Sequence, residues 1–178
     1  MAKNSATQIE QDQKKITDEI LKNANKSINE IAKKCGFSRQ KVWRLIKNME
    51  KNNTIWGYVT VIDPEKINKK RYVMLMKRKN KPIPKEIANQ ISNREIEKIV
   101  KKWGVEFINS TYLNGKFDYL ISFDANDLKE AINVVELYRK LYTGFISEIE
   151  LHEEIFPVKK DGINNPEINK INDFFNAK

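Results

Sequence analysis

The sequence has little of what most enzymes and disulfide-stabilised proteins need. Its 178 residues include one cysteine, one histidine and six glycines. The single cysteine, Cys35, cannot form an internal disulfide. The single histidine, His152, would be the only base available for Ser-His-Asp or Cys-His catalysis. We find no glycine-rich phosphate loop and no Cys/His spacing typical of a zinc site. The composition therefore argues against an enzyme, and we expect neither a cofactor nor a metal.

Long apolar runs are also missing. No stretch of about eighteen apolar residues is present, so we expect no membrane span. The first residues are polar and lack the apolar segment of a secretory signal. We therefore expect a cytoplasmic protein, and its hydrophobic fraction of 40% is enough for the cores of one or two small domains.

Charge is distributed unevenly along the chain. The net charge is +9, but residues 1–81 contain 20 Lys and Arg against 8 Asp and Glu, whereas residues 82–178 contain 13 against 16. The first half therefore carries the positive field, which attracts polyanions such as nucleic acids. A lysine-rich soluble surface with no such partner is the simpler alternative.

The pattern of apolar residues divides the chain into five parts. The sequence predicts a disordered tail, a helix-turn-helix, a linker strand with a connector, a βαββαβ domain and a C-terminal extension. The respective ranges are 1–11, 12–54, 55–70, 71–158 and 159–178.

The segment 27–58 has the layout of a helix-turn-helix. Ser27 followed by Glu30 predicts a capping box at the start of one helix, and Gly36 stands where a left-handed C-cap residue is favoured. Ser38 is expected to cap the next helix, which has one apolar stripe at helical spacing. That stripe consists of Val42, Leu45, Ile46 and Met49.

The second half of the chain predicts a ferredoxin-like α+β fold with one antiparallel sheet and two helices. Asn114-Gly115 between two apolar runs is a hairpin signal. Asn126 is expected to cap the second helix, with Leu128, Ala131, Ile132, Val135 and Tyr138 on its core face. The expected strands are 72–76, 105–113, 117–123 and 145–156, and the expected helices are 85–102, broken near residue 92, and 126–142. A short helix is also expected within 166–175.

Taken together, these pieces resemble the leucine-responsive (Lrp/AsnC) family of prokaryotic transcription regulators. The resemblance rests on the helix-turn-helix, on the linker motif Ile55-Trp56-Gly57-Tyr58 with Asp63-Pro64, and on the hairpin motif Gly115-Lys116-Phe117-Asp118-Tyr119. It covers residues 12–158. The resemblance implies a dimer or higher oligomer formed through the C-terminal domain, and an amino-acid effector as a further partner.

The second helix of the motif is predicted to enter the major groove of double-stranded DNA. The side chains expected to reach the bases lie at its start and along the face opposite the apolar stripe. Glutamine can pair with adenine and arginine with guanine. These residues are Ser38, Arg39, Gln40, Lys41, Arg44 and Lys47. Lys33 and Lys34 on the preceding helix are expected to contact phosphates, which position the protein without reading sequence.

The resemblance implies an effector site at the hairpin. Backbone amides near Gly115 would hold a carboxylate, and Asp118 would hold an ammonium group. Ordinary turn chemistry explains the same two residues, because Gly permits positive φ and Asp accepts amide hydrogen bonds.

Three other features have simple structural explanations. We expect Trp43 to pack beside Trp56 and Tyr58 as an anchor. Cys35 is expected to be a small buried turn residue rather than a redox switch. The acidic row around His152 has the ligand types of a metal site, but such a row is more typical of a solvated or subunit-facing surface.

Two alternatives to a transcription regulator remain open. One is an enzyme on the same scaffold, similar to tetrapyrrole decarboxylases. The other is an RNA-binding module in which Phe117, Tyr119 and Phe123 stack on bases.

Overall fold

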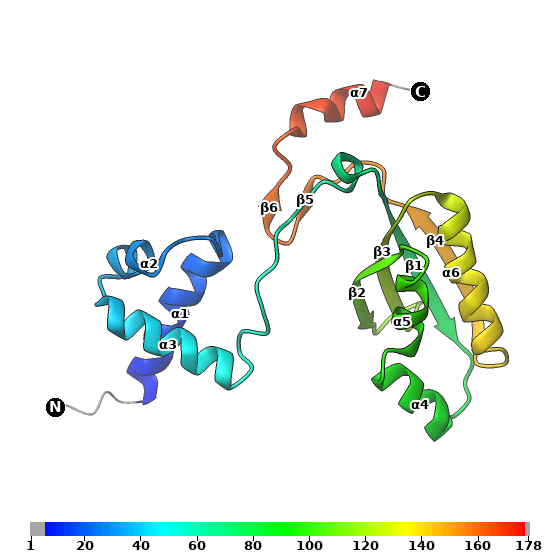
Figure 1. Ribbon diagram of the computed structural model, residues 1–178, viewed down its shortest axis with the longest axis horizontal. Coiled ribbons are helices and arrows are strands. Elements are labelled where there is room, and N and C mark those ends of the chain that lie inside the picture. The colour runs from blue at the N-terminus through cyan, green and yellow to red at the C-terminus, as the bar shows by residue number, and fades with distance from the viewer. Residues whose placement is uncertain (1–5, 177–178) are drawn as a thin grey trace. The chain divides into compact units, whose positions relative to one another are not determined.

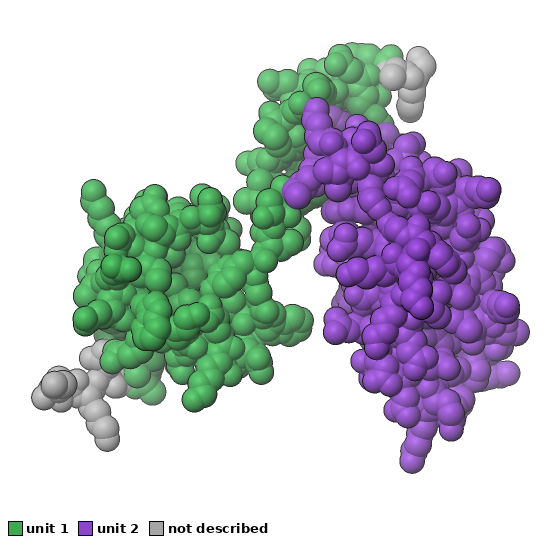
Figure 2. Space-filling model, viewed as in Figure 1, with its two compact units in different colours: residues 1–61, 158–178 green, residues 62–157 purple. Residues whose placement is uncertain are grey.

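The computed structural model describes residues 6–176, and the chain divides into two compact units. The first unit comprises the N-terminal residues to Val61 together with the segment from Val158 onward. The second unit comprises Ile62–Pro157. Figure 1 labels the elements and Figure 2 colours the two units.

Three helices form the core of the first unit. Ile16 of the first helix packs against buried side chains of the second and third helices. Val42 is fully buried and Met49 almost so, because apolar residues at i, i+3, i+4 and i+7 share one helix face. The predicted apolar stripe is therefore confirmed. The helices are α1 (Ala6–Lys22), α2 (Ile28–Cys35) and α3 (Arg39–Lys51).

The predicted helix caps are present. The amide of Ser27 donates to the Glu30 carboxylate at 2.8 Å, and the Glu30 amide donates to Ser27 Oγ at 3.3 Å. Gly36 ends α2 in the left-handed conformation with φ +69°, where a side chain would be strained. Ser38 Oγ accepts the Lys41 amide at 3.2 Å and so caps α3. These local bonds set the turn between α2 and α3.

The prediction of a tail over residues 1–11 is wrong from Ala6 onward. Helix α1 begins at Ala6, and Asp12 within it is buried. The remainder of the predicted tail, residues 1–5, lies outside the described residues. The sequence did not reveal the start of this helix because residues 6–11 are mostly polar and none of them is buried.

The prediction of a linker strand over 55–62 is also wrong. This segment forms no strand pairing, and Trp56 is 92% exposed. A strand needs a hydrogen-bonded neighbour, and none is present among the described residues of this chain. The segment ends in the 3₁₀ turn η1 (Pro64–Ile67), which Asp63 caps.

The second unit is the predicted βαββαβ domain. Its four strands form one antiparallel sheet in the order β2-β3-β1-β4. The predicted break in the first helical segment is confirmed, because Arg94 with φ +52° separates α4 from α5. The elements are β1 (Lys70–Arg78), α4 (Lys85–Ser92), α5 (Glu95–Lys101), β2 (Glu106–Tyr112), β3 (Tyr119–Ala125), α6 (Leu128–Leu141) and β4 (Ile146–Glu153).

One face of this sheet carries the core. Tyr72 and Met74 of β1 pair with Phe123 and Ile121 of β3, and all four are fully buried with side chains of α5 and α6. Successive residues of a strand point to opposite faces, so Leu75 lies on the other face.

Two local predictions in this unit need correction. The Asn114-Gly115 connection is not a tight two-residue turn, because β2 ends at Tyr112, β3 begins only at Tyr119, and neither Asn114 nor Gly115 has positive φ. The cap of α6 is Asp127, whose carboxylate accepts the Glu130 amide at 2.8 Å, rather than Asn126.

The core face of α6 also differs in part from the prediction. Leu128 and Ile132 are exposed, whereas Val134 is fully buried. Ala131, Val135 and Tyr138 are buried as predicted. The buried face of α6 is therefore rotated relative to the predicted face, because packing against the sheet determines which side of the helix is covered.

The C-terminal extension has structure of its own. A short hairpin pairs Lys159 with Asn164, and the predicted terminal helix is confirmed over a shorter range. The elements are β5 (Lys159–Lys160), β6 (Ile163–Asn164), η2 (Ile168–Lys170) and α7 (Ile171–Asn176).

Candidate DNA interface

Helix α3 has one buried face and one face that is open to solvent. Arg39, Gln40, Arg44 and Lys47 are all exposed, and the last three lie opposite the buried stripe. Gln40, Arg44 and Lys47 follow one another at i, i+4 and i+7 and therefore share a face. Of these, Lys47 already pairs with Glu50, at 2.7 Å between Nζ and Oε2. The exposed face is thus cationic and rich in hydrogen-bond donors.

Lys41 differs from the other predicted contacts because it is held within its own domain. Its Nζ atom lies 2.6 Å from Asp12 Oδ2 and 4.1 Å from the centre of the Phe37 ring. The hydrogen bond from Lys41 holds the pKa of the Asp12 carboxyl below its usual value. Lys41 therefore joins the start of α3 to α1, and the sequence analysis missed Asp12 as its partner.

Ser38 also has a structural role, as the N-cap residue of α3. Its Oγ atom accepts the amide of Lys41, and the residue itself is exposed. An N-cap hydroxyl satisfies one orphan amide of the helix, and its own proton remains available to an acceptor. Ser38 thus fixes where α3 begins.

Lys33 and Lys34 lie exposed in the last turn of α2. Lys34 is 3.9 Å from a Glu19 oxygen. Hydrogen bonds from Lys22 and Lys26 lower the pKa of Glu19 to about 2, so Glu19 is a carboxylate at neutral pH. Its charge therefore offsets part of the field at Lys34.

The predicted aromatic anchor around Trp43 is wrong. Trp43 is 52% exposed and Trp56 is almost entirely exposed. Tyr58 instead donates a hydrogen bond from its hydroxyl to Glu50 at 3.1 Å. The segment after α3 therefore touches the end of that helix through a polar contact rather than an aromatic one.

Cys35 is half-buried, and its Sγ atom lies 3.6 Å from the carbonyl oxygen of Lys15. Burial raises the pKa of its thiol, which lowers the fraction of reactive thiolate. The structure therefore favours the packing role that was predicted for this residue.

The hairpin residues Gly115 and Asp118 lie in the second unit. Asp118 Oδ2 accepts the backbone amide of Arg78 at 2.7 Å, and the Asp118 amide donates to the Met76 carbonyl at 2.9 Å. Gly115 is exposed with open space around it. Asp118 thus holds the end of β1, a role that turn chemistry alone did not specify.

Neighbouring side chains contact two carboxylates of the acidic row on β4. Lys116 lies 3.7 Å from Glu148 and 3.3 Å from Glu150, and His152 lies 3.1 Å from Glu150. Within residues 6–176, no group of three metal-ligating side chains is close enough to share an ion. Among the same residues, no helix is long and apolar enough to cross a bilayer.

The aromatic residues of β3 do not form an RNA-binding platform. Phe123 is fully buried and its ring stacks on Tyr72 at 5.8 Å between centroids. Tyr119 lies on the same helix-covered face. Stacking on RNA bases requires exposed rings on an open sheet, so this alternative loses its main support.

Comparisons with known proteins agree with this arrangement. The family described as "Winged helix-turn-helix DNA-binding" matches residues 13–55. A glutamate uptake regulatory protein of Zymomonas mobilis is 29% identical over 139 residues, which is 77% of this chain and 75% of that protein.

Solved structures share the two-domain fold. An AsnC family transcriptional regulator from Agrobacterium tumefaciens superposes with a TM-score of 0.58 at 21% identity, over 84% of this chain and 92% of that one. A transcriptional regulator of Neisseria meningitidis, solved in complex with L-Met, superposes with a TM-score of 0.62 at 17% identity, over 84% and 91%.

The N-terminal unit is a helix-turn-helix DNA-binding domain. The regulatory relative and the shared two-domain fold agree with the predicted resemblance to Lrp/AsnC transcription regulators.

Proposed function

We propose that α3 is the recognition helix and that Arg39, Gln40 and Arg44 read base edges in the major groove. The observation that carries the proposal is the division of α3 into a fully packed face and an exposed cationic face. A helix that is fixed on one side can present the other to DNA without losing its own core contacts. Lys47 and Ser38 would supply flanking contacts.

Lys33 and Lys34 would neutralise phosphates beside the groove. Both are exposed on the helix that precedes α3, and phosphate contacts set the register of a helix-turn-helix on the duplex. Lys41 is assigned a positioning role, because its ammonium group is already shared with Asp12 and Phe37.

We further propose that the protein binds DNA as a homodimer or higher oligomer that assembles through the second unit. The open face of the sheet carries the apolar side chains of Val73, Leu75 and Leu120, all half-buried. Ser122 on the same face has a buried Oγ atom with no hydrogen-bond partner within the described chain. A second copy would cover the apolar residues and offer that hydroxyl a partner.

Two copies related by a two-fold axis would place two recognition helices in successive major grooves. The operator should then be a rough palindrome with half-sites about one helical turn apart. Selection of bound duplexes from a random pool tests this directly. An enriched palindrome supports the proposal, and a pool without enrichment would contradict it.

An amino acid remains our proposal for the effector, with the amides near Gly115 and the carboxylate of Asp118 as its site. The carboxylate already accepts the Arg78 amide through one oxygen, which leaves the other for an ammonium group. Calorimetry against the twenty amino acids tests this site, with Asp118→Asn as the variant. Absence of heat across the whole panel would contradict it.

The open sheet face gives a separate test of assembly. Leu75→Glu would place a charge in the proposed contact, and sedimentation should then show a monomer. The matched variant Lys98→Glu changes an exposed residue of α5, which packs on the opposite face of the sheet, and should keep the assembly. A monomeric wild-type protein would rule out the proposed contact.

A further inference from the structure

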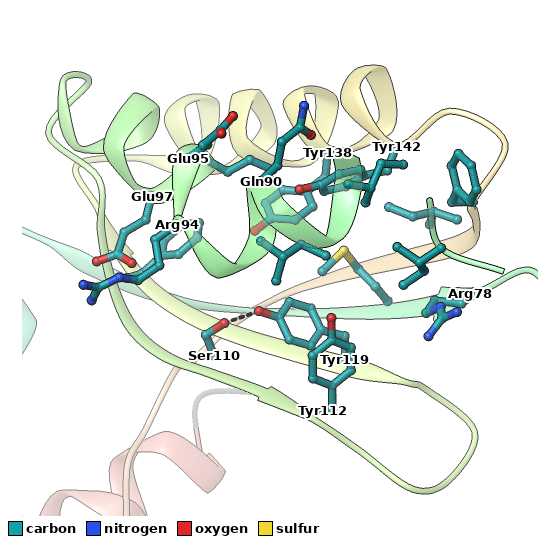
Figure 3. A pocket seen from close by; sticks show the side chains of 18 residues that line it. Arg78, Gln90, Arg94, Glu95, Glu97, Ser110, Tyr112, Tyr119, Tyr138 and Tyr142 are labelled. Atoms are coloured by element: carbon teal, nitrogen blue, oxygen red, sulfur yellow. Dashed lines mark hydrogen bonds between the residues drawn. The ribbon is translucent and has the colours of Figure 1, made fainter. Parts of the chain in front are cut away.

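The second unit contains a cavity of about 110 Å³ that the DNA-binding role does not use. It lies between the sheet and the helices, and its walls come from β1, α4, α5, β2, β3 and α6. Figure 3 shows Tyr112 and Tyr119 lining it from the sheet, Tyr138 from α6 and Tyr142 from the residue that follows α6. The remaining wall combines apolar side chains, such as Ile87 and Ile91 of α4, with charged and polar ones at its margin.

The cavity exists because α4 stands apart from the core. No residue of α4 is fully buried, whereas α5 buries Ile96 and Val100. The left-handed Arg94 separates the two helices, so α4 contributes only half-buried isoleucines to the wall. The apolar space below α4 is therefore left unfilled by this chain.

Two tyrosine hydroxyl groups line this cavity without a hydrogen-bond partner among the described residues. Tyr138 and Tyr142 are 6% and 7% exposed, and their rings lie 5.7 Å apart. Within the described residues, neither hydroxyl makes a hydrogen bond, whereas the hydroxyl of Tyr119 bonds to Ser110. Water in the cavity can accept from both hydroxyl groups. A ligand that displaces this water must offer an acceptor in its place, or the hydrogen bonds are lost without replacement.

The surroundings favour an uncharged acceptor. Burial raises the pKa of the Tyr138 hydroxyl well above its usual range, which means that this environment disfavours negative charge. The charged side chains in the wall balance in sign, with Arg78 and Arg94 against Glu95 and Glu97. A carboxylate would lose its hydration here and gain no net positive field in return.

The size of the space limits the ligand further. A dry apolar cavity of about 150 Å³ in another protein holds a benzene molecule. A space of 110 Å³ therefore suits one small ring or a branched chain of similar bulk.

We propose that this cavity binds a small, uncharged, mainly apolar molecule with one oxygen acceptor, which accepts hydrogen bonds from Tyr138 and Tyr142. This site is separate from the hairpin proposed for an amino-acid effector. It also stands independently of DNA recognition, because its walls lie wholly within the second unit.

The test uses cyclohexanone as the probe and methylenecyclohexane as its acceptor-free match of the same shape. The full-length protein is labelled at its methionine methyl groups, and each probe is titrated by NMR. Met76 lines the cavity, whereas Met49 belongs to the helical core of the first unit. We expect a saturable shift of the Met76 signal with an unchanged Met49 signal, and tighter binding of the ketone.

Variants distinguish the contribution of the hydroxyl groups to binding from the contribution of the cavity volume. Tyr138→Phe and Tyr142→Phe should each weaken the ketone about two- to tenfold and leave the hydrocarbon unchanged, because one hydrogen bond is lost without a change of shape. Ile91→Phe should fill the cavity and abolish binding of both probes. Tyr58→Phe, which alters an exposed tyrosine of the first unit, should change neither affinity.

The Met74 signal, from a fully buried core residue outside the cavity wall, verifies that each variant is folded. The proposal is overturned if neither probe gives a saturable Met76 shift in the folded wild-type protein. It is also overturned if the two probes bind equally, or if removing both hydroxyls leaves the preference for the ketone unchanged.

Discussion

The ammonium group of Lys41 lies 2.6 Å from the buried carboxylate of Asp12, which ties the first turn of α3 to the middle of α1. Gln8 completes the contact by donating to Asp12 at 3.1 Å. The orientation of α3 therefore depends on a polar bond as well as on its apolar stripe. This bond is the basis of the first two predictions.

Asp12→Asn should destabilise the helical unit by about 1.5–3 kcal/mol, the usual contribution of a hydrogen bond to a charged group. Urea unfolding, followed through the Met49 methyl signal, measures this domain alone. Asp18→Asn changes an exposed carboxylate of the same helix and should shift stability by less than about 0.5 kcal/mol. Equal effects of the two variants would mean that the Asp12–Lys41 bond contributes nothing specific.

The contribution of Asp12 should depend on pH. Its pKa is lowered below 3.8 in the folded protein by the hydrogen bond from Lys41. The unfolded chain therefore takes up the proton first, and the stabilisation is fully present above about pH 5. The stability difference between wild type and Asp12→Asn should shrink as the pH falls below 3.8 toward the folded-state pKa. A difference that stays constant from pH 7 to pH 3 would contradict the assignment.

Arg39→Ala and Gln40→Ala should each relax the preference at one base pair by about 1–3 kcal/mol, because a bidentate base contact is lost. Binding should be measured on the selected operator and on each single-base substitution of it. Arg139→Ala, an exposed arginine of the second unit, is the matched control. Uniform weakening on every duplex would reassign Arg39 or Gln40 to phosphate contacts.

Lys33→Ala should weaken binding to all sequences alike. Loss of one phosphate contact should lower the slope of log affinity against log salt by about one unit. Lys98→Ala removes an exposed lysine of the second unit and should leave the slope unchanged. If the slope of the Lys33 variant equals that of wild type, Lys33 lies outside the interface.

Gly36→Ala should destabilise the helical unit by about 1–2 kcal/mol, the cost of a left-handed conformation for a residue with a Cβ atom. No atom lies within 4 Å of the added carbon, so the effect comes from φ +69° and not from a clash. Gly57→Ala, where φ is not positive and space is also open, should be neutral within about 0.5 kcal/mol. Urea unfolding of both variants decides the point, and equal stabilities would contradict the role of φ.

Much of the architecture could be predicted because its signals are local. The capping box of Ser27 and Glu30, the C-cap at Gly36 and the break near residue 92 each depend on residues within one or two turns. Helical periodicity likewise indicated which residues of α3 are buried. Sequence spacing is sufficient to predict a helix when its capping residues and its apolar face are all encoded within the helix and its immediate neighbours.

Other features depend on partners that are distant in sequence. The pairing of Asp12 with Lys41, the bond of Asp118 to Arg78 and the rotation of the buried face of α6 arise only when elements pack together. The predicted strand at 55–62 failed for the same reason, because alternation permits a strand but pairing requires a neighbour.

The amino-acid sequence by itself determined the type of domain, the ends of its central helices and the cationic residues of α3, since these follow from periodicity, capping and charge along a short stretch. Only the tertiary structure decided which cationic side chains of α3 remain free of contacts within the protein. It also decided where a cavity is left between packed elements. Lys41 forms an ion pair with Asp12 of α1. The cavity beside Tyr138 is present because no residue of α4 is fully buried in the core. Both depend on distances between residues far apart in the chain, which no local pattern encodes.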